Sequence, residues 1–233
     1  MASPESHPGT NSRSRLSGSS APLSAAALAG GASRRMGSDK ALLSLVPGGE
    51  PLLGIVLEQL AHVSDDLLVV ANNQERYAPF GARVVPDLHP EVGALGGIHA
   101  AIARSAHEHC LVVACDMPFL CLPLLRRMAG EPRDYDVLVP LIPGESRQRP
   151  DGLVFQTLHA IYSKRCLPFI ENRIAEGKKQ VIGFFEDVRV RTLDVAEVVR
   201  WDPDLRSFFN ANTPEALLTA AEMIPRLERG PSN

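Results

Sequence analysis

The sequence predicts an α/β fold with a Rossmann-like, mostly parallel twisted sheet and helices on both of its faces. Short apolar runs alternate along the chain with segments of helical periodicity, which is the pattern of such sheets. The chain has 233 residues, 45% hydrophobic and 22% charged, a balance typical of globular domains. Ligands of these sheets bind outside the carboxyl ends of the strands, so polar residues that follow strands are the first site candidates.

Five apolar runs predict buried strands. The first, at residues 21–29, is built from small residues and precedes a glycine-rich turn. The others are rich in leucine or β-branched residues, end near polar residues or proline, and lie at 67–71, 82–85, 110–115 and 136–139.

Five segments predict helices, because their apolar residues recur every three or four positions, as at Leu52, Val56 and Leu60. They lie at 51–63, 97–106, 120–129, 164–176 and 213–224. In the last of them, Thr213 is expected to cap the helix and Pro214 to take its first position.

The two ends of the chain are expected to lie outside the folded domain. Residues 1–21 are crowded with Ser, Gly, Pro and Asn and predict a disordered tail, and 226–233 predict a loose end, leaving 22–225 as one domain. The run 21–29 has a weak resemblance to a secretory signal, but Pro22 and Ser24 interrupt it. Because no stretch approaches the roughly 18 to 20 apolar residues of a membrane span, we expect a cytoplasmic protein without a membrane partner.

Charge and cysteine usage exclude several classes of function. The formal net charge is −3, so no global basic surface for nucleic acid is expected. The four cysteines (Cys110, Cys115, Cys121, Cys166) lack a C-x-x-C pair and are typical of reduced core thiols. The histidines have no convincing metal spacing, and we assign no catalysis to His99, His107, His109 or His159.

The strongest local signal is the glycine-rich segment 28–40, directly after the first predicted strand. Its three glycines allow main-chain N–H groups to approach phosphate oxygens, and Arg34, Arg35 and Lys40 add cations suited to a triphosphate. The segment is neither a Walker A loop nor a G-x-G-x-x-G fingerprint. It predicts a nucleotide-binding loop, with a plain glycine turn bearing solvated arginines as the alternative.

Residues 28–41 follow the pattern L-A-G-G-x-S-x-R-M-G-x-D-K-A, which resembles the signature loop of MobA-type molybdenum cofactor guanylyltransferases, members of the nucleotidyltransferase superfamily. Further matching segments occur in the family's order at 84–87, 93–97, 115–119 and 209–215, so the resemblance covers most of residues 24–220. One departure is the run Arg149-Pro150-Asp151-Gly152-Leu153, where the family often has a compact R-P-x-P-L-x-A-x-Y.

The resemblance implies a role for each matching residue. Main-chain groups of Leu28, Ala29 and Gly30 would contact the nucleotide, and Lys40 would bind its phosphates. Asp116 would hold Mg²⁺, and Asp87 would contact the guanine nucleotide.

Other implied contacts are less closely defined. The segment 93–97 would close over the base and ribose, and an asparagine after the second strand, Asn72 or Asn73, would also contact the nucleotide. The segment holding Asn210 and Asn212 would lie near the active site. The second half of the chain would recognise a pterin, for which the candidates are Arg147, Arg149 and Lys164.

The implied reaction is transfer of GMP from GTP to the phosphate of molybdenum-bound molybdopterin, with release of pyrophosphate. Arg35 and Lys40 would stabilise the charge on the leaving phosphates, and Asp116 would bind the metal. A phosphate nucleophile is already largely ionised near neutral pH, since its second pKa is about 6, so no general base is required. The residues alone also permit a helix N-cap role for Asp116 and a turn role for Asp87.

Two other functions remain open from the sequence. A cytidylyltransferase acting on the same pterin or on a sugar or polyol phosphate would share the loop chemistry, although such enzymes often carry L-A-A-G where this chain has Leu28-Ala29-Gly30-Gly31. A non-catalytic GTP-binding adaptor would keep the fold without turnover. For the guanylyltransferase, transient contact with proteins that deliver the pterin or mature molybdoenzymes is expected.

Overall fold

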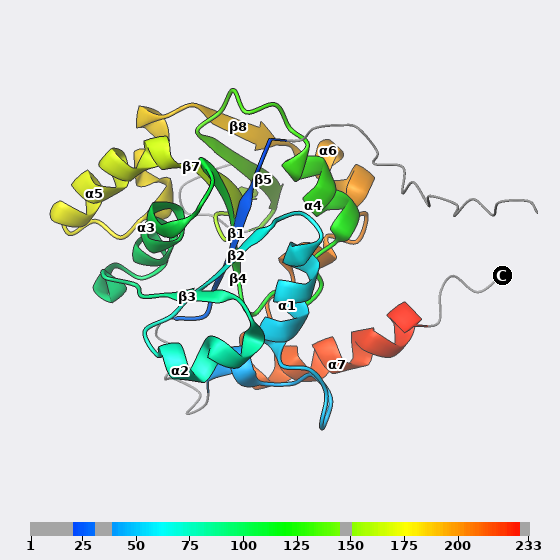
Figure 1. Ribbon diagram of the computed structural model, residues 1–233. Coiled ribbons are helices and arrows are strands. Elements are labelled where there is room, and N and C mark those ends of the chain that lie inside the picture. The colour runs from blue at the N-terminus through cyan, green and yellow to red at the C-terminus, as the bar shows by residue number, and fades with distance from the viewer. Residues whose placement is uncertain (1–20, 31–38, 145–150, 229–233) are drawn as a thin grey trace, which may run out of the picture.

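A computed structural model describes residues 21–30, 39–144 and 151–228 of the chain. The described residues form one eight-stranded sheet in the order β3-β2-β1-β4-β7-β5-β6, with β8 beside β5 (Figure 1). The strands are β1 Ser24–Leu28, β2 Asp66–Val70, β3 Arg83–Val85, β4 His109–Ala114, β5 Val137–Pro143, β6 Leu153–Phe155, β7 His159–Ser163 and β8 Val190–Leu193. The α/β fold class and the five predicted strands are confirmed.

The sheet is parallel where the predicted strands meet and antiparallel around β7. β1 pairs in parallel with both β2 and β4, β2 with β3, and β5 with β8. β7 runs antiparallel to β4 and β5, and β6 runs antiparallel to β5. Three strands, β6, β7 and β8, had no counterpart among the predicted elements.

Helices cover both faces of the sheet (Figure 1). One face carries α1 (Leu52–Ala61), α4 (Leu122–Ala129) and α6 (Val195–Trp201), and the other carries α3 (Ala94–Arg104) and α5 (Leu167–Ala175). The short α2 (Gln74–Tyr77) and the long α7 (Pro214–Glu228) lie along the edge where β1 and β2 end. Thr213 Oγ1 accepts a hydrogen bond from Ala216 N at 3.1 Å, which confirms the predicted cap of α7.

The two faces bury separate apolar cores because side chains of each strand alternate between them. In β1, Ala25 and Ala27 pack toward α1 and α4, whereas Ala26 and Leu28 pack toward α3. All four cysteines are free thiols, and Cys110, Cys115 and Cys166 are buried while Cys121 is half-buried. Burial raises the pKa of each of these thiols.

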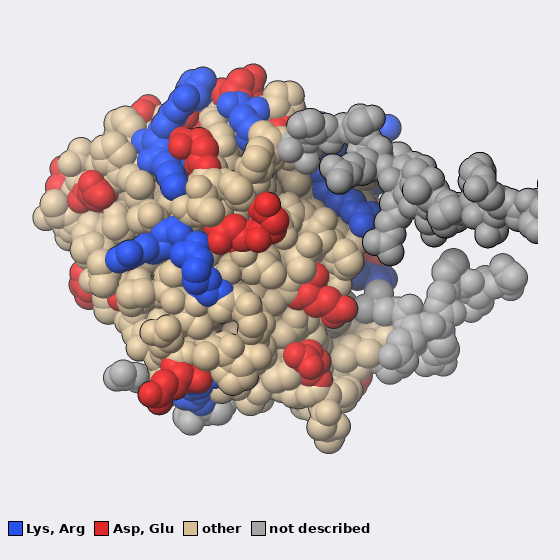
Figure 2. Space-filling view, viewed as in Figure 1, with Lys and Arg blue, Asp and Glu red and all other residues tan. Residues whose placement is uncertain are grey.

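Charged side chains are mixed by sign on the face seen in Figure 2, where Lys and Arg lie beside Asp and Glu. This distribution agrees with the small formal net charge of −3. Among the described residues, no helix has the length and apolar character needed to cross a lipid bilayer.

Candidate active site at the carboxyl edge of the sheet

The candidate site lies where the chain changes direction across the sheet. β2 and β3 follow β1 on one side, and the chain then returns to add β4 on the other side of β1. A crevice is expected at such a switch point, beyond the carboxyl ends of the strands. Ala29 and Gly30 follow β1, Asp116 follows β4, and Cys115 N donates to Leu28 O at 3.2 Å. The first predicted loop and the predicted metal ligand therefore meet at this point.

Gly30 directly follows β1 and is anchored to the end of β2. Ala29 N and Gly30 N both donate to Val70 O at 3.1 Å, which anchors the chain as it leaves β1. A Cβ added at Gly30 would lie 3.6 Å from Val70 O, an ordinary van der Waals contact. Packing against the described residues therefore does not require a glycine at this position, and close approach of a ligand to its main chain stays a prediction.

The far end of the predicted nucleotide loop is held by a helical cap. Asp39 Oδ1 accepts from Ala41 N at 3.2 Å and begins the 3₁₀ turn Lys40–Leu42. Lys40 is half-buried and is the first residue of this turn. Arg34 and Arg35 fall outside the described residues, so the role expected of Arg35 remains a prediction.

Asp116 is half-buried and faces the charge of Lys40. Burial raises the pKa of the Asp116 carboxyl group, while the positive charge of Lys40 opposes that rise. The carbonyl of Asp116 accepts a hydrogen bond from Ala211 N at 2.8 Å, which ties it to the segment before α7. The alternative role as a helix cap is wrong, because α4 begins at Leu122 and its N-cap is Cys121.

The donor set at Asp116 fits a hard cation that also takes ligands from a substrate. Among the described residues, no three His, Cys, Asp or Glu side chains are grouped so that they could hold a metal ion by themselves. Mg²⁺ commonly binds one or two carboxylates and completes its octahedron with waters and substrate phosphates. A single carboxylate between two strand ends, with a cation beside it, suits that mode of binding.

Asp87 and Asn72 are brought together at the ends of β3 and β2. Asn72 Oδ1 accepts from Asp87 N at 2.8 Å, and Asp87 Oδ1 accepts from His89 N at 2.8 Å. Asn73 instead caps α2, with its Oδ1 accepting from Arg76 N at 3.1 Å. Of the two asparagines, Asn72 therefore lies beside Asp87. Burial raises the pKa of the Asp87 carboxyl group, whose bond to His89 N also shows the turn role.

The two strand-end aspartates lie too far apart to share one ion. β3 and β4 are separated by β2 and β1, so the strand ends carrying Asp87 and Asp116 are about 14 Å apart at ordinary strand spacing. A ligand that reached both would lie across the ends of β1 and β2. An extended molecule with different groups at its two ends fits this arrangement better than a compact one.

The segment 93–97 forms the start of a helix and not a loop. Gly93 has φ 65° and ψ −131° and is the N-cap of α3, which begins three residues earlier than predicted. A Cβ at Gly96 would lie 2.3 Å from His89 O and 2.8 Å from Asp87 Oδ1. Gly96 therefore lets α3 pack against the Asp87 turn, and the expected contact of this segment with the base and ribose stays a prediction.

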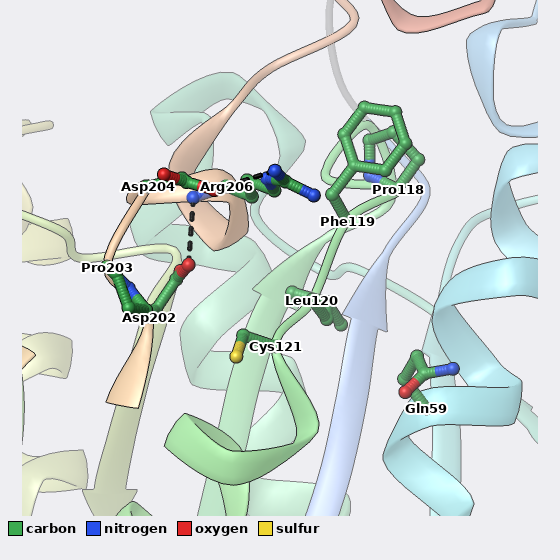
Figure 3. Close-up of a pocket in the computed structure, with 9 residues that line it drawn as sticks. All are labelled: Gln59, Pro118, Phe119, Leu120, Cys121, Asp202, Pro203, Asp204 and Arg206. Atoms are coloured by element: carbon green, nitrogen blue, oxygen red, sulfur yellow. Dashed lines mark hydrogen bonds and ion pairs between the residues drawn. The ribbon is translucent and has the colours of Figure 1, made fainter. Parts of the chain in front are cut away.

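A second hydrogen-bond network, which the sequence did not predict, joins the chain that follows Asp116 to residues 202–207. Buried Asp202 accepts from Arg206 N at 3.1 Å and Ser207 N at 2.9 Å, and Ser207 Oγ accepts from Cys121 N at 2.8 Å. Asp202, Arg206, Cys121 and Phe119 are among the residues that line a hollow of about 380 Å³, and Figure 3 shows their side chains. No motif marks these residues, which meet only through the fold.

The three residues expected to recognise the pterin are Arg147, Arg149 and Lys164. Arg147 and Arg149 fall outside the described residues. Lys164 lies at the amino end of β4, where its N donates to Glu108 O at 2.9 Å and its Nζ to Ser105 O at 2.8 Å. That position is at the opposite edge from Asp116, so the structure does not bring Lys164 to the site.

A basic hollow at the end of α5 was not predicted. The chain enters α5 near Ser105, which follows the end of α3. Further along α5, Glu171 Oε1 lies 3.2 Å from His99 Nε2 in the middle of α3. The two helices therefore run in opposite directions, and α5 ends on the side of the carboxyl edge. The hollow, of about 260 Å³, is lined in part by Arg173, Lys178 and Lys179. The adjacent lysines were the signal available in the sequence. Two of the three cations already pair with carboxylates, Arg173 with Asp187 at 3.6 Å and Lys178 with Glu176 at 2.7 Å.

Three of the histidines considered above differ in their surroundings. His107 Nε2 lies 2.7 Å from Asp65 Oδ1, and His109 Nε2 lies 3.4 Å from Tyr135 O. His159 is fully buried in β7, and neither of its ring nitrogens has a hydrogen-bond partner.

Comparisons with known proteins agree on one class. A family model described as the MobA-like NTP transferase domain matches residues 25–190. A probable molybdenum cofactor guanylyltransferase from Pelotomaculum thermopropionicum is 41% identical over 204 residues, covering 87% of this chain and 94% of the relative. A molybdenum cofactor guanylyltransferase from Desulfosudis oleivorans is 34% identical over 198 residues, covering 84% and 93%. The crystal structure of molybdopterin-guanine dinucleotide biosynthesis protein A from Archaeoglobus fulgidus matches with a TM-score of 0.71 at 29% identity, covering 87% of this chain and 99% of that one.

Proposed function

Because the chain belongs to the MobA-like NTP transferase family, we propose that it transfers GMP from GTP to the phosphate of molybdenum-bound molybdopterin. The products would be molybdopterin guanine dinucleotide and pyrophosphate. The class of enzyme, a nucleotidyltransferase, follows from the family; the base and the acceptor are the proposal. The names of the relatives and of the related solved structure support both choices.

The observation that carries the proposal is the meeting of Lys40, Asp116 and Gly30 at the switch point of the sheet. Nucleotidyl transfer requires a triphosphate held with its α-phosphorus accessible and its leaving charge balanced by cations. Gly30 offers close main-chain approach, Lys40 offers a cation, and Asp116 offers a hard carboxylate beside it. Each requirement of the reaction therefore has a described residue that suits it.

We assign the nucleotide an extended position across the strand ends. The base and ribose would lie toward Asp87 and Asn72, and the phosphates toward Lys40 and Asp116, since the two aspartates lie at opposite sides of the β1 end. Asp116 would hold Mg²⁺, which supplies charge neutralisation on the phosphate oxygens when bound. Lys40, and Arg35 by expectation, would bind the oxygens that leave as pyrophosphate.

Asp116→Asn tests the proposal, because it keeps the side-chain size and removes the negative charge that a metal needs. With Mg²⁺, GTP and the molybdenum-bound pterin, we expect pyrophosphate release to fall about 100- to 1,000-fold, the size of effect seen when a group stabilising developing charge is removed. Asp65→Asn is the matched control, since exposed Asp65 pairs with His107, away from the carboxyl edge. The expected result for this control is an unchanged rate.

Three outcomes would overturn parts of the proposal. An undiminished rate in Asp116→Asn would remove the metal role. Stronger thermal stabilisation of the wild-type protein by CTP than by GTP would replace the guanylyltransferase with a cytidylyltransferase. Stabilisation by GTP without pyrophosphate release, in protein shown to be folded, would identify a binding protein without turnover.

A further inference from the structure

Tyr77 lies between the two ends of the segment predicted to bind the nucleotide. It is the last residue of α2 and is 4% exposed. Its hydroxyl lies 2.5 Å from Asp39 Oδ2 and 3.4 Å from the carbonyl oxygen of Ala29. Ala29 directly follows β1, and Asp39 directly precedes Lys40, so one side chain contacts both ends.

The Asp39 carboxylate is held on both of its oxygens. Oδ2 accepts from Tyr77 and lies 3.3 Å from Arg76 Nε, while Oδ1 accepts from Ala41 N at 3.2 Å. The residues on either side of Lys40 are thus tied to α2 and to the turn that follows. Burial and the nearby Asp39 carboxylate raise the pKa of Tyr77, so its hydroxyl keeps its proton and remains a donor.

We propose that Tyr77 is a positioning residue that joins the two ends of the nucleotide-binding segment and thereby sets the direction in which Lys40 leaves the chain. This inference rests on the proposed function, which assigns Lys40 to the triphosphate. Tyr77 itself would touch no substrate. It acts through Ala29 and Asp39, whose main chains lead into the segment from its two sides.

The physical advantage is preorganisation. Bringing the ends of a chain segment together costs conformational entropy, which a ligand must otherwise supply when it binds. Tyr77 and Asp39 are 38 residues apart in sequence, and the bond between them meets this cost within the folded protein. Loss of the hydroxyl should therefore weaken nucleotide binding without changing any group that touches the nucleotide.

A purely structural role is the competing explanation, because Tyr77 is also part of the apolar core on the α1 face. Tyr135 provides a matched comparison. It is 2% exposed, and its hydroxyl also bonds to a charged side chain, that of Arg133. Tyr135 lies just before β5, at the amino edge of the sheet, away from the candidate site.

The test compares Tyr77→Phe with Tyr135→Phe, each measured for the dissociation constant of GTP with Mg²⁺ by calorimetry and for the free energy of unfolding. We expect Tyr77→Phe to weaken GTP binding about tenfold, the loss of one hydrogen bond to a charged group. Tyr135→Phe should keep GTP binding within about twofold while losing comparable stability. Equal GTP binding by wild type and Tyr77→Phe would overturn the inference.

A double-mutant cycle separates this inference from the proposed function. Asp39→Ala and Tyr77→Phe should be strongly non-additive in GTP binding, since each removes the same contact. A wild-type protein that bound no GTP would overturn the proposed function instead. In that case the free energy of unfolding would be measured for the same two variants and their combination. Additive effects on this free energy would overturn the inference.

Discussion

Because His159 is buried, we expect the free energy of unfolding to depend measurably on pH. Its side chain is fully buried in β7, packs against the Phe208 ring with centroids 5.0 Å apart, and has no hydrogen-bond partner on either ring nitrogen. This burial lowers the pKa of His159 to about 4, from an unfolded value of 6.5. Between these two values the unfolded chain binds a proton that the folded protein does not.

The sign and size of the effect follow from this difference. Stability contributed by neutral His159 is complete above pH 6.5 and is lost as the pH falls toward about 4, because protonation favours the unfolded chain. From about pH 7.5 to about pH 5 the expected loss is about 2 kcal/mol. That loss is a large share of the stability of an ordinary domain.

His159→Leu should remove this part of the pH dependence. At about pH 7.5 we expect its free energy of unfolding to stay within about 1.5 kcal/mol of wild type, since losing two unpaired polar atoms offsets the imperfect fit. At about pH 5 the variant should gain about 2 kcal/mol relative to wild type. Denaturant unfolding followed by circular dichroism at both pH values measures the difference.

Exposed His62 provides the control. His62→Gln should keep the loss of stability that His159 causes, because it leaves His159 buried and without a hydrogen-bond partner. The reasoning would be refuted if His159→Leu lost as much stability between the two pH values as wild type does.

Glycine substitutions at the carboxyl edge should separate packing from ligand binding. Gly96→Ala is expected to lower the free energy of unfolding by about 1 to 3 kcal/mol in denaturant titrations, because its Cβ would lie 2.3 Å from His89 O. Gly30→Ala should change the free energy of unfolding by less than about 1 kcal/mol, yet weaken GTP binding measured by calorimetry. Strong destabilisation with normal GTP binding would contradict the role given to Gly30. Ser207→Ala removes the acceptor of Cys121 N and should cost about 1 to 3 kcal/mol in the same unfolding measurement; no loss would show that this bond does not support the Asp116 segment.

β6, β7 and α6 were not predicted, because their sequences lack the apolar patterns by which strands and helices are identified. The five predicted strands are nearly continuous apolar runs because helices cover them on both faces. β6 has only three residues, all half-buried. β7 begins with His159 and ends with Ser163, so only Ala160, Ile161 and Tyr162 lie between polar residues. α6 buries one residue, Val198, so it has no apolar stripe to detect.

The sequence by itself determined the fold class, the glycine-rich segment after β1 and the identity of Asp116 and Lys40 as site candidates. These features are local, since each depends on spacing within a short stretch of chain. Only the tertiary structure decided that Asn72 faces Asp87 while Asn73 caps a helix, that Lys164 lies at the far edge, and that Tyr77 joins Ala29 to Asp39. Apart from the local cap made by Asn73, these contacts join residues far apart in the chain, and their partners are set by strand order and register, which no single segment encodes.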